Sequence, residues 1–136
     1  MRAVLDPNVI VSALLSSGTT AAVLDAWLER RACEPVICPT LLGELEEVLA
    51  RPKFSSVGHE VVSGVLERLR TDGDSRGDPE VEAGVTADPG DDYLVALARE
   101  AQADCLVSGD PDLHEVNIED VEVLTPAEFL ARLQEL

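Results

Sequence analysis

The sequence predicts an α/β fold in which helices cover both faces of a central, mainly parallel sheet. Short apolar runs that are partly β-branched and end at turn residues predict buried strands. They alternate with segments whose apolar residues recur at helical spacing. This alternation favours parallel strands with helices packed on the two faces of the sheet. The 136 residues show no internal repeat, so we expect one domain over residues 1–136.

The first predicted strand ends at Asp6, and Pro7 follows it directly. An Asp followed by Pro predicts a helix start, with Asp at the N-cap and Pro at the first helical position. The same order, a strand and then an Asp-Pro pair, recurs at Asp110 and Pro111. Asp6 and Asp110 are therefore expected to cap helices, a role that can leave one carboxylate oxygen free.

The remaining elements follow in order along the chain. Strands are predicted at residues 3–5, 34–38, 81–86, 104–108 and 121–124. Helices are predicted at residues 8–15, 19–31, 40–51, 55–70, 91–101 and 127–136. Residues 71–79 are polar and contain two glycines, which predicts a flexible loop. Before the last helix, Thr125, Pro126 and Glu128 form a predicted capping box.

Composition narrows the class of protein. No apolar run approaches the roughly 18 residues of a membrane span. The first residues lack the charged, apolar and small-residue regions of a signal peptide. Cys33, Cys38 and Cys105 are odd in number and show no CxxC spacing, so neither a disulfide framework nor a zinc site is indicated. We expect a cytoplasmic protein with reduced thiols and no membrane partner.

The charge is strongly negative and unevenly distributed. The net charge is −17, with 11 acidic and 8 basic residues up to Arg76 but 16 acidic and 2 basic residues from Gly77 onward. A field of this sign repels nucleic acid unless cations or a local basic patch intervene. Candidate phosphate contacts are therefore the basic residues of the first half, which can also be solvated helix ends: Arg51, Lys53, Arg68 and Arg70.

Several acidic residues could share one site. Asp6 and Asp110 would meet at one edge of the sheet if their strands are neighbours. Glu44 lies alongside the predicted buried stripe of its helix, whereas the next two glutamates point further away. Asp91 and Asp92 start a helix, where acids favour the helix dipole, and periodicity does not choose between them.

Carboxylates without a cluster of His or Cys ligands match hard cations, so Mg²⁺ or Mn²⁺ would suit these acids. Such a site can activate water and neutralise phosphate charge, as in metal-assisted hydrolysis of phosphodiesters. His59 and His114 are isolated in the sequence and are expected to be surface or structural residues.

Four stretches in this order, VLDPNVIVSALL, TLLGELEEVLARPKF, DPGDDYLVALA and CLVSGDPDL, resemble PIN-domain proteins. The nearest resemblance is to the single-domain VapC-like ribonucleases, the toxins of bacterial and archaeal toxin–antitoxin pairs. It implies a three-layer α/β/α fold, Mg²⁺- or Mn²⁺-dependent cleavage of RNA, and a cognate antitoxin protein. The family's acidic residues correspond to Asp6, Glu44, Asp92 and Asp110.

The resemblance also assigns secondary positions. Asn8 and Ser108 would be polar neighbours of the acids, and Asp91 and Asp112 outer ligands. Pro7 stands where the family usually has Thr, which removes a hydroxyl and a backbone N–H. We also expect a homodimer or a higher oligomer.

Two other functions are compatible with parts of the sequence. A PIN fold that has lost turnover could act as a binding module for a protein partner, an alternative suggested by Pro7 and the negative charge. Phosphoryl transfer through an aspartyl phosphate also uses an Asp after a strand. Sites of this kind, in receiver domains and haloacid-dehalogenase-type phosphatases, place a lysine near the phosphate. Here the sole lysine, Lys53, lies just past the predicted helix of Glu44 and not after a late strand, and Asn8 stands where those phosphatases need a second Asp.

Overall fold

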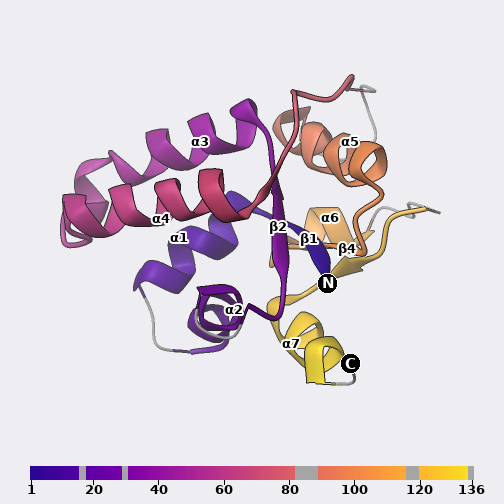
Figure 1. Cartoon of the computed structure of the whole chain (residues 1–136), viewed down its shortest axis with the longest axis horizontal. Coiled ribbons are helices and arrows are strands. Elements are labelled where there is room, and N and C mark those ends of the chain that lie inside the picture. The colour runs from indigo at the N-terminus through magenta and orange to yellow at the C-terminus, as the bar shows by residue number, and fades with distance from the viewer. Residues whose placement is uncertain (16–17, 29–30, 82–88, 116–119, 135–136) are drawn as a thin grey trace.

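The computed structural model describes the chain except residues 16–17, 29–30, 82–88, 116–119 and 135–136. Its centre is a sheet whose five strands are all parallel, in the order β3-β2-β1-β4-β5 (Figure 1). The strands are β1 (Arg2–Leu5), β2 (Glu34–Ile37), β3 (Asp74–Ser75), β4 (Cys105–Val107) and β5 (Val123–Leu124). Because all strands run the same way, they start at one edge of the sheet, the amino edge, and end at the other, the carboxyl edge.

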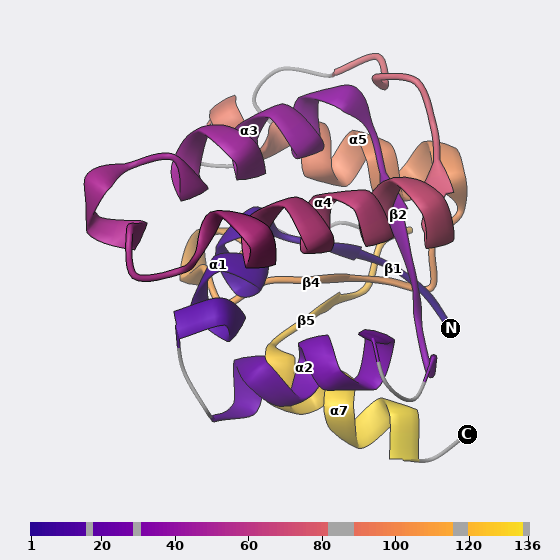
Figure 2. The same ribbon diagram turned by 60° about the vertical axis from the view of Figure 1, so that its left-hand side comes forward.

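Helices cover both faces of this sheet. In the described residues they are α1 (Pro7–Leu15), α2 (Thr19–Leu28), α3 (Pro39–Leu49), α4 (His59–Asp72), α5 (Asp92–Ala101), α6 (Pro111–Glu115) and α7 (Pro126–Gln134), with short 3₁₀ turns η1 (Pro52–Phe54) and η2 (Pro89–Asp91). Figure 2 shows α3, α4 and α5 on one side of the strands and α2 and α7 on the other. The predicted three-layer α/β/α fold is confirmed.

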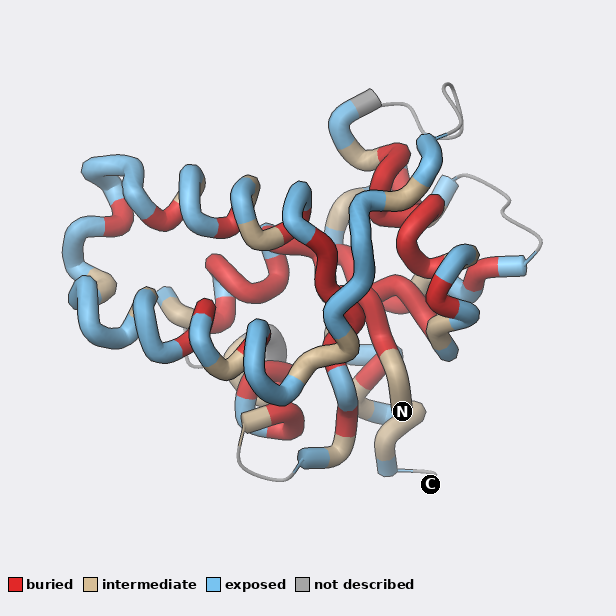
Figure 3. The backbone as a smooth tube through the Cα atoms, turned by 45° about the horizontal axis from the view of Figure 1, so that its top comes forward, coloured by how far each residue is buried: buried red, intermediate tan, exposed pale blue. Residues whose placement is uncertain are grey.

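The core lies along the two central strands and the helices that contact them. The three residues of β4 and most of β1 are fully buried, as expected for parallel strands covered on both faces. Helix α5 contacts β1, β2 and β4 and is buried almost all round. By contrast, α3 and α4 project from the sheet and expose their outer faces (Figure 3).

The predicted helix starts are confirmed by their capping hydrogen bonds. The N–H of Thr125 donates to Glu128 Oε1 (3.0 Å), and the N–H of Glu128 donates to Thr125 Oγ1 (3.1 Å), which completes the capping box at α7. Pro7 and Pro111 are the first residues of α1 and α6. A proline fits there because the first helical N–H has no partner within the helix.

The structure corrects the loop predicted at residues 71–79. Helix α4 continues to Asp72, and Asp74 and Ser75 then form β3, an outermost strand of the sheet that pairs with β2. This strand has no apolar side chain to reveal it in the sequence. Backbone pairing with β2 positions it, including the N–H of Arg76 donating to the Ile37 carbonyl (2.9 Å).

Two other helix boundaries also differ from the prediction. Helix α4 starts at His59 rather than at residue 55, because the η1 turn precedes it. Arg31, predicted to lie in a helix, has a φ of 51° and is not helical. Of the strand predicted at 81–86, residues 82–86 lie outside the described residues, and Val81 has no regular structure.

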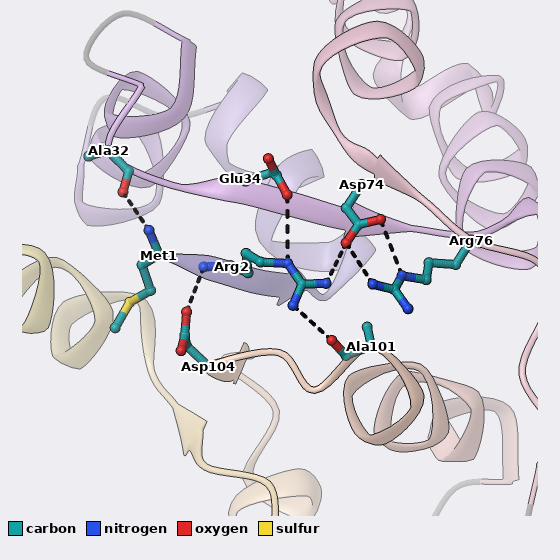
Figure 4. A network of polar contacts seen from close by, with 8 residues as sticks. All are labelled: Met1, Arg2, Ala32, Glu34, Asp74, Arg76, Ala101 and Asp104. Carbon is teal, nitrogen blue, oxygen red and sulfur yellow. Dashed lines mark hydrogen bonds and ion pairs between the residues drawn. The ribbon is translucent and has the colours of Figure 1, made fainter.

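A polar network ties the amino edge together (Figure 4). The Arg2 guanidinium forms a short ion pair with Asp74 and donates to the Ala101 carbonyl (2.8 Å). Arg2 also lies 3.6 Å from Glu34, and Arg76 lies 3.1 Å from Asp74. These charged side chains join β1, β2, β3 and the end of α5, so Asp74 and Glu34 have cationic partners at this edge.

The three cysteines are buried and free in the structure. Burial raises the pKa of Cys33 and Cys38 to about 11 and that of Cys105 to about 12, so these thiols stay protonated. No helix in the described part of the chain is long and apolar enough to cross a membrane.

Candidate active site

Asp6 and Asp110 lie at the carboxyl edge of two adjacent strands. β1 pairs with β4 in parallel, with Leu5 opposite Val107, and the N–H of Asp6 donates to the Val107 carbonyl (2.9 Å). The two strand ends therefore emerge side by side, at the edge where ligands bind in open α/β sheets. The condition on which Asp6 and Asp110 were expected to meet, that their strands are neighbours, is therefore met.

The Asp6 carboxylate is buried, with only 3% of the residue exposed. Its Oδ1 accepts a hydrogen bond from the backbone N–H of Asn8 (3.0 Å), and its Oδ2 accepts one from the Ser108 hydroxyl (2.8 Å). Pro7 has no N–H, so Asn8 supplies the capping contact, and each oxygen of the Asp6 carboxylate accepts one hydrogen bond.

Burial raises the pKa of Asp6, although both hydrogen bonds act in the opposite direction; the nearby charge of Asp110 raises the pKa further. In the part of the chain that the structure describes, no basic side chain forms an ion pair with Asp6. An ionised carboxylate in such a place is costly without a cation. The site thus favours a positively charged partner.

Ser108 and Asp110 form a turn between β4 and α6. The N–H of Asp110 donates to Ser108 Oγ (3.0 Å), and Asp110 Oδ1 accepts from the N–H of Asp112 (3.0 Å). Asp110 is thus the cap of α6, as predicted, and Asp112 contacts it through the backbone. A carboxylate has about four lone-pair positions, so Asp6 and Asp110 keep capacity for further contacts.

An open cleft of about 410 Å³ lies over these two carboxylates. It is lined by Asp6, Asn8, Val9, Ser12, Gly109, Asp110, Pro111 and Pro126. Asn8 is exposed here, whereas Ser108 lies beneath the surface with no exposure. The cleft has the position and the acidic character of a cation site, with Asp6 at its buried end.

Glu44 does not line this cleft and contacts a residue that the sequence interpretation missed. The Tyr93 hydroxyl donates to Glu44 Oε2 (2.5 Å), which links α5 to α3. Burial, and then the hydrogen bond to Glu44, raise the pKa of Tyr93, and the charge of Asp6 contributes in the same direction. Tyr93 therefore lies within electrostatic reach of both carboxylates. A signal was present: a buried tyrosine usually needs a partner for its hydroxyl.

The structure distinguishes Asp91 from Asp92. Asp92 is the first residue of α5 and is 2% exposed, whereas Asp91 is the half-buried N-cap residue. The inward position of Asp92 agrees with its assignment as the inner acid and that of Asp91 as an outer one. Their convergence with Asp6 stays a prediction, because the described residues contain no group of three His, Cys, Asp or Glu side chains arranged to hold a metal ion.

The four basic residues predicted to contact RNA are not gathered at the cleft. Arg51 and Lys53 lie at the connection between α3 and α4, and the Lys53 ammonium lies 5.0 Å from the centre of the Phe54 ring. Arg68 pairs with Asp72 (2.7 Å) and lines a second hollow, of about 290 Å³, at the amino edge. Arg70 is exposed. Their role in RNA binding stays a prediction.

A family model described as PIN domain matches residues 2–112. The chain belongs to the PIN domain family. The match includes every acid assigned to the site, from Asp6 to Asp112. No curated protein gives a significant match. PIN domains are generally nucleases and typically use divalent metal ions, so the family supports a nuclease function for this PIN domain.

The residues at the cleft of this PIN domain fit such a metal ion. Mg²⁺ and Mn²⁺ prefer oxygen ligands and are held by one or a few carboxylates together with water. Asp6 and Asp110 supply carboxylate oxygens without a competing ion pair among the described residues. A divalent cation would offset the cost of burying the charge of Asp6.

Proposed function

We propose that this PIN domain is a Mg²⁺- or Mn²⁺-dependent endoribonuclease that hydrolyses RNA phosphodiester bonds as the toxin of a toxin–antitoxin pair. The observation that carries the proposal is the buried Asp6 carboxylate, hydrogen-bonded to Ser108 and set in one cleft with Asp110. A structural cap would not need this burial, because surface carboxylates cap helices equally well.

The protein residues would divide the work by position. Asp6 and Asp110 would hold the cation from the cleft, with Glu44 and Asp92 completing the acidic set. A divalent cation bound there supplies charge neutralisation on the phosphodiester and an activated water. The hydroxyl of Ser108 orients Asp6, and the backbone of Asn8 fixes its other oxygen.

The charge of the molecule supports a narrow contact with RNA. A net charge of −17 disfavours broad affinity for phosphates, so a cation at the cleft would bring the scissile phosphate in. Arg51, Lys53, Arg68 and Arg70 would contact the RNA outside the cleft. The same negative charge would attract a basic segment of an antitoxin protein and so block the cleft. We further propose that the protein acts as a homodimer or a higher oligomer.

Cleavage of RNA by the full chain tests the proposal, with Mn²⁺ or Mg²⁺ added and in a matched sample with chelator. We expect cleavage with metal, none in chelator, and loss of cleavage in Asp6→Asn, which keeps the size of the side chain. Asp25→Asn is the matched control, because Asp25 is exposed on α2 and does not line the cleft. Cleavage by Asp6→Asn with metal, and by the wild type in chelator, as fast as that of the wild type with metal would overturn the proposal.

The second candidate is a binding module without turnover. It is favoured by the absence of a three-acid metal group among the described residues and by the contact of Glu44 with Tyr93. Calorimetry separates the two: the nuclease binds Mn²⁺ with a stoichiometry that Asp6→Asn reduces. A module would bind no Mn²⁺ and would bind a basic peptide tightly.

A further inference from the structure

Ser108 is fixed by hydrogen bonds at each of its polar groups. Its N–H donates to the Leu124 carbonyl (2.9 Å), and its hydroxyl donates to Asp6 Oδ2 (2.8 Å) and accepts from the N–H of Asp110 (3.0 Å). The fourth contact comes from His114, whose Nε2 lies 2.6 Å from the Ser108 carbonyl oxygen. Ser108 itself is fully buried, and the contact of its hydroxyl with Asp6 is shielded from water.

The imidazole of His114 is the donor in this contact. A carbonyl oxygen can only accept, so Nε2 must carry the proton. His114 belongs to α6, a helix of five residues, and turns back onto the residue at the end of β4. Asp110 caps the same helix through its contact with the N–H of Asp112 (3.0 Å). The turn between Ser108 and α6 is therefore closed by contacts at both ends.

This turn depends on such contacts because α6 is too short to be stable alone. Isolated helices of fewer than about 12 residues are marginal in water. Rotation of the Ser108 peptide would move the hydroxyl away from Asp6 and release the N–H of Asp110. A contact that holds the Ser108 carbonyl thus acts on both carboxylates of the cleft.

We propose that His114 is a positioning residue of the site, which holds the Ser108 carbonyl so that Asp6 and Asp110 face the same cation. The inference rests on the proposed function, in which these two acids bind Mg²⁺ or Mn²⁺. His114 contacts neither carboxylate in any hydrogen bond described for it. Its effect reaches them through Ser108, whose hydroxyl bonds to Asp6 and accepts from Asp110.

Substitution of His114 by two amides separates positioning from bulk. The amide nitrogen of Gln occupies a place equivalent to imidazole Nε2, whereas that of Asn is equivalent to Nδ1. We expect His114→Asn and His114→Ala to weaken the affinity for Mn²⁺ by about fivefold, the factor that corresponds to loss of one hydrogen bond. His114→Gln should restore most of this affinity. The affinity is measured by calorimetry on the full chain.

A second readout needs no metal. Hydrogen exchange at the N–H of Asp110 reports whether its bond to Ser108 Oγ persists, and we expect faster exchange in His114→Ala and His114→Asn than in His114→Gln. His59→Ala is the matched control, because His59 is exposed at the start of α4 and should leave both measurements unchanged.

The outcomes distinguish this inference from the proposed function. A wild-type chain that binds Mn²⁺ without cleaving RNA contradicts the proposed nuclease function. The role of His114 is then decided by the Mn²⁺ affinities of its variants. A wild-type chain that binds no Mn²⁺ contradicts the metal site, and with it the role of His114 towards a cation. Wild-type affinity and unchanged exchange at Asp110 in His114→Ala would overturn the inference directly. So would equal losses in His114→Gln and His114→Asn, because packing alone would then explain them.

Discussion

At the amino edge of the sheet Asp74 pairs with Arg2 and Arg76, whereas at the carboxyl edge Asp6 accepts hydrogen bonds from two uncharged donors. The carboxylate held by uncharged donors is the more deeply buried of the two. The side chain of Asp74 is 21% exposed and has cations beside it, whereas Asp6 is 3% exposed and has none among the described residues.

This difference shows that the same residue type lies in two opposite electrostatic environments of one chain. A compensated carboxylate ties strands together and contributes to stability. A buried carboxylate held by neutral donors keeps its charge unsatisfied, which favours binding of a cation at the expense of folding. The pKa directions agree, because hydrogen bonds from Arg76 and Arg2 lower the pKa of Asp74 while burial raises that of Asp6.

The largest difference between the edges should be in RNA cleavage. We expect Asp110→Asn to lower kcat about 100-fold or more, because a metal site contributes several kcal/mol to charge stabilisation. The amide keeps an oxygen that can cap α6, so the fold should persist. Asp74→Asn should cleave RNA within about twofold of the wild type, since it changes only the contacts with Arg2 and Arg76 at the other edge. Steady-state kinetics with Mn²⁺ measure both, and a similar loss in the two variants would remove the distinction.

The next effect is on stability at the amino edge. Arg2→Met should lower the free energy of unfolding by about 2 kcal/mol, because hydrogen bonds to charged groups contribute about 1.5–3 kcal/mol and Asp74 would lose one partner. Urea denaturation measures it. Arg51→Met is the control and should change stability by less than about 0.5 kcal/mol, since its pair with Glu47 is long and exposed. RNA cleavage should be unaffected by Arg2→Met.

A smaller effect on stability is expected from the hydrogen bond between the neutral Tyr93 hydroxyl and Glu44. Tyr93→Phe removes the hydroxyl that donates to Glu44 and should lower the free energy of unfolding by about 1 kcal/mol. The half-buried Glu44 can turn to water, which limits the loss. Urea denaturation beside Arg2→Met tests the order of the two effects. A larger loss in Tyr93→Phe than in Arg2→Met would contradict it.

The smallest effect is the response to pH, and its sign should differ between the edges. The pKa of Asp6 is raised in the folded state. Its contribution to the free energy of unfolding is therefore present below the ordinary aspartate pKa of about 3.9 and is lost as the pH rises through the raised value. The pKa of Asp74 is lowered, so its contribution is present above about 3.9 and is lost as the pH falls through the lowered value.

Unfolding curves in chelator across this range measure the two contributions. Relative to the wild type, Asp6→Asn should gain stability as the pH rises, and Asp74→Asn should lose it. The same sign in both variants would show that the two carboxylates are in similar environments.

Local sequence signals were sufficient for the elements whose hydrogen bonds are local. The Asp-Pro starts at Asp6 and Asp110 and the capping box at Thr125 were predictable, because their partners lie two or three residues away. The apolar runs of β1 and β4 were predictable for a related reason: strands buried on both faces must be apolar throughout. Alternation of these elements then predicted a parallel sheet.

Only the tertiary structure decided what depends on contacts between distant residues. β3 has no apolar signal and is positioned by pairing with β2 and by the ion pair of Asp74 with Arg2. The donors Tyr93 and Ser108 reach Glu44 and Asp6 across 49 and 102 residues of sequence. The sequence by itself determined which acids could form a site. Packing determined that Asp6 and Asp110 share a cleft without a cation beside Asp6, because burial and charge compensation depend on every neighbouring element.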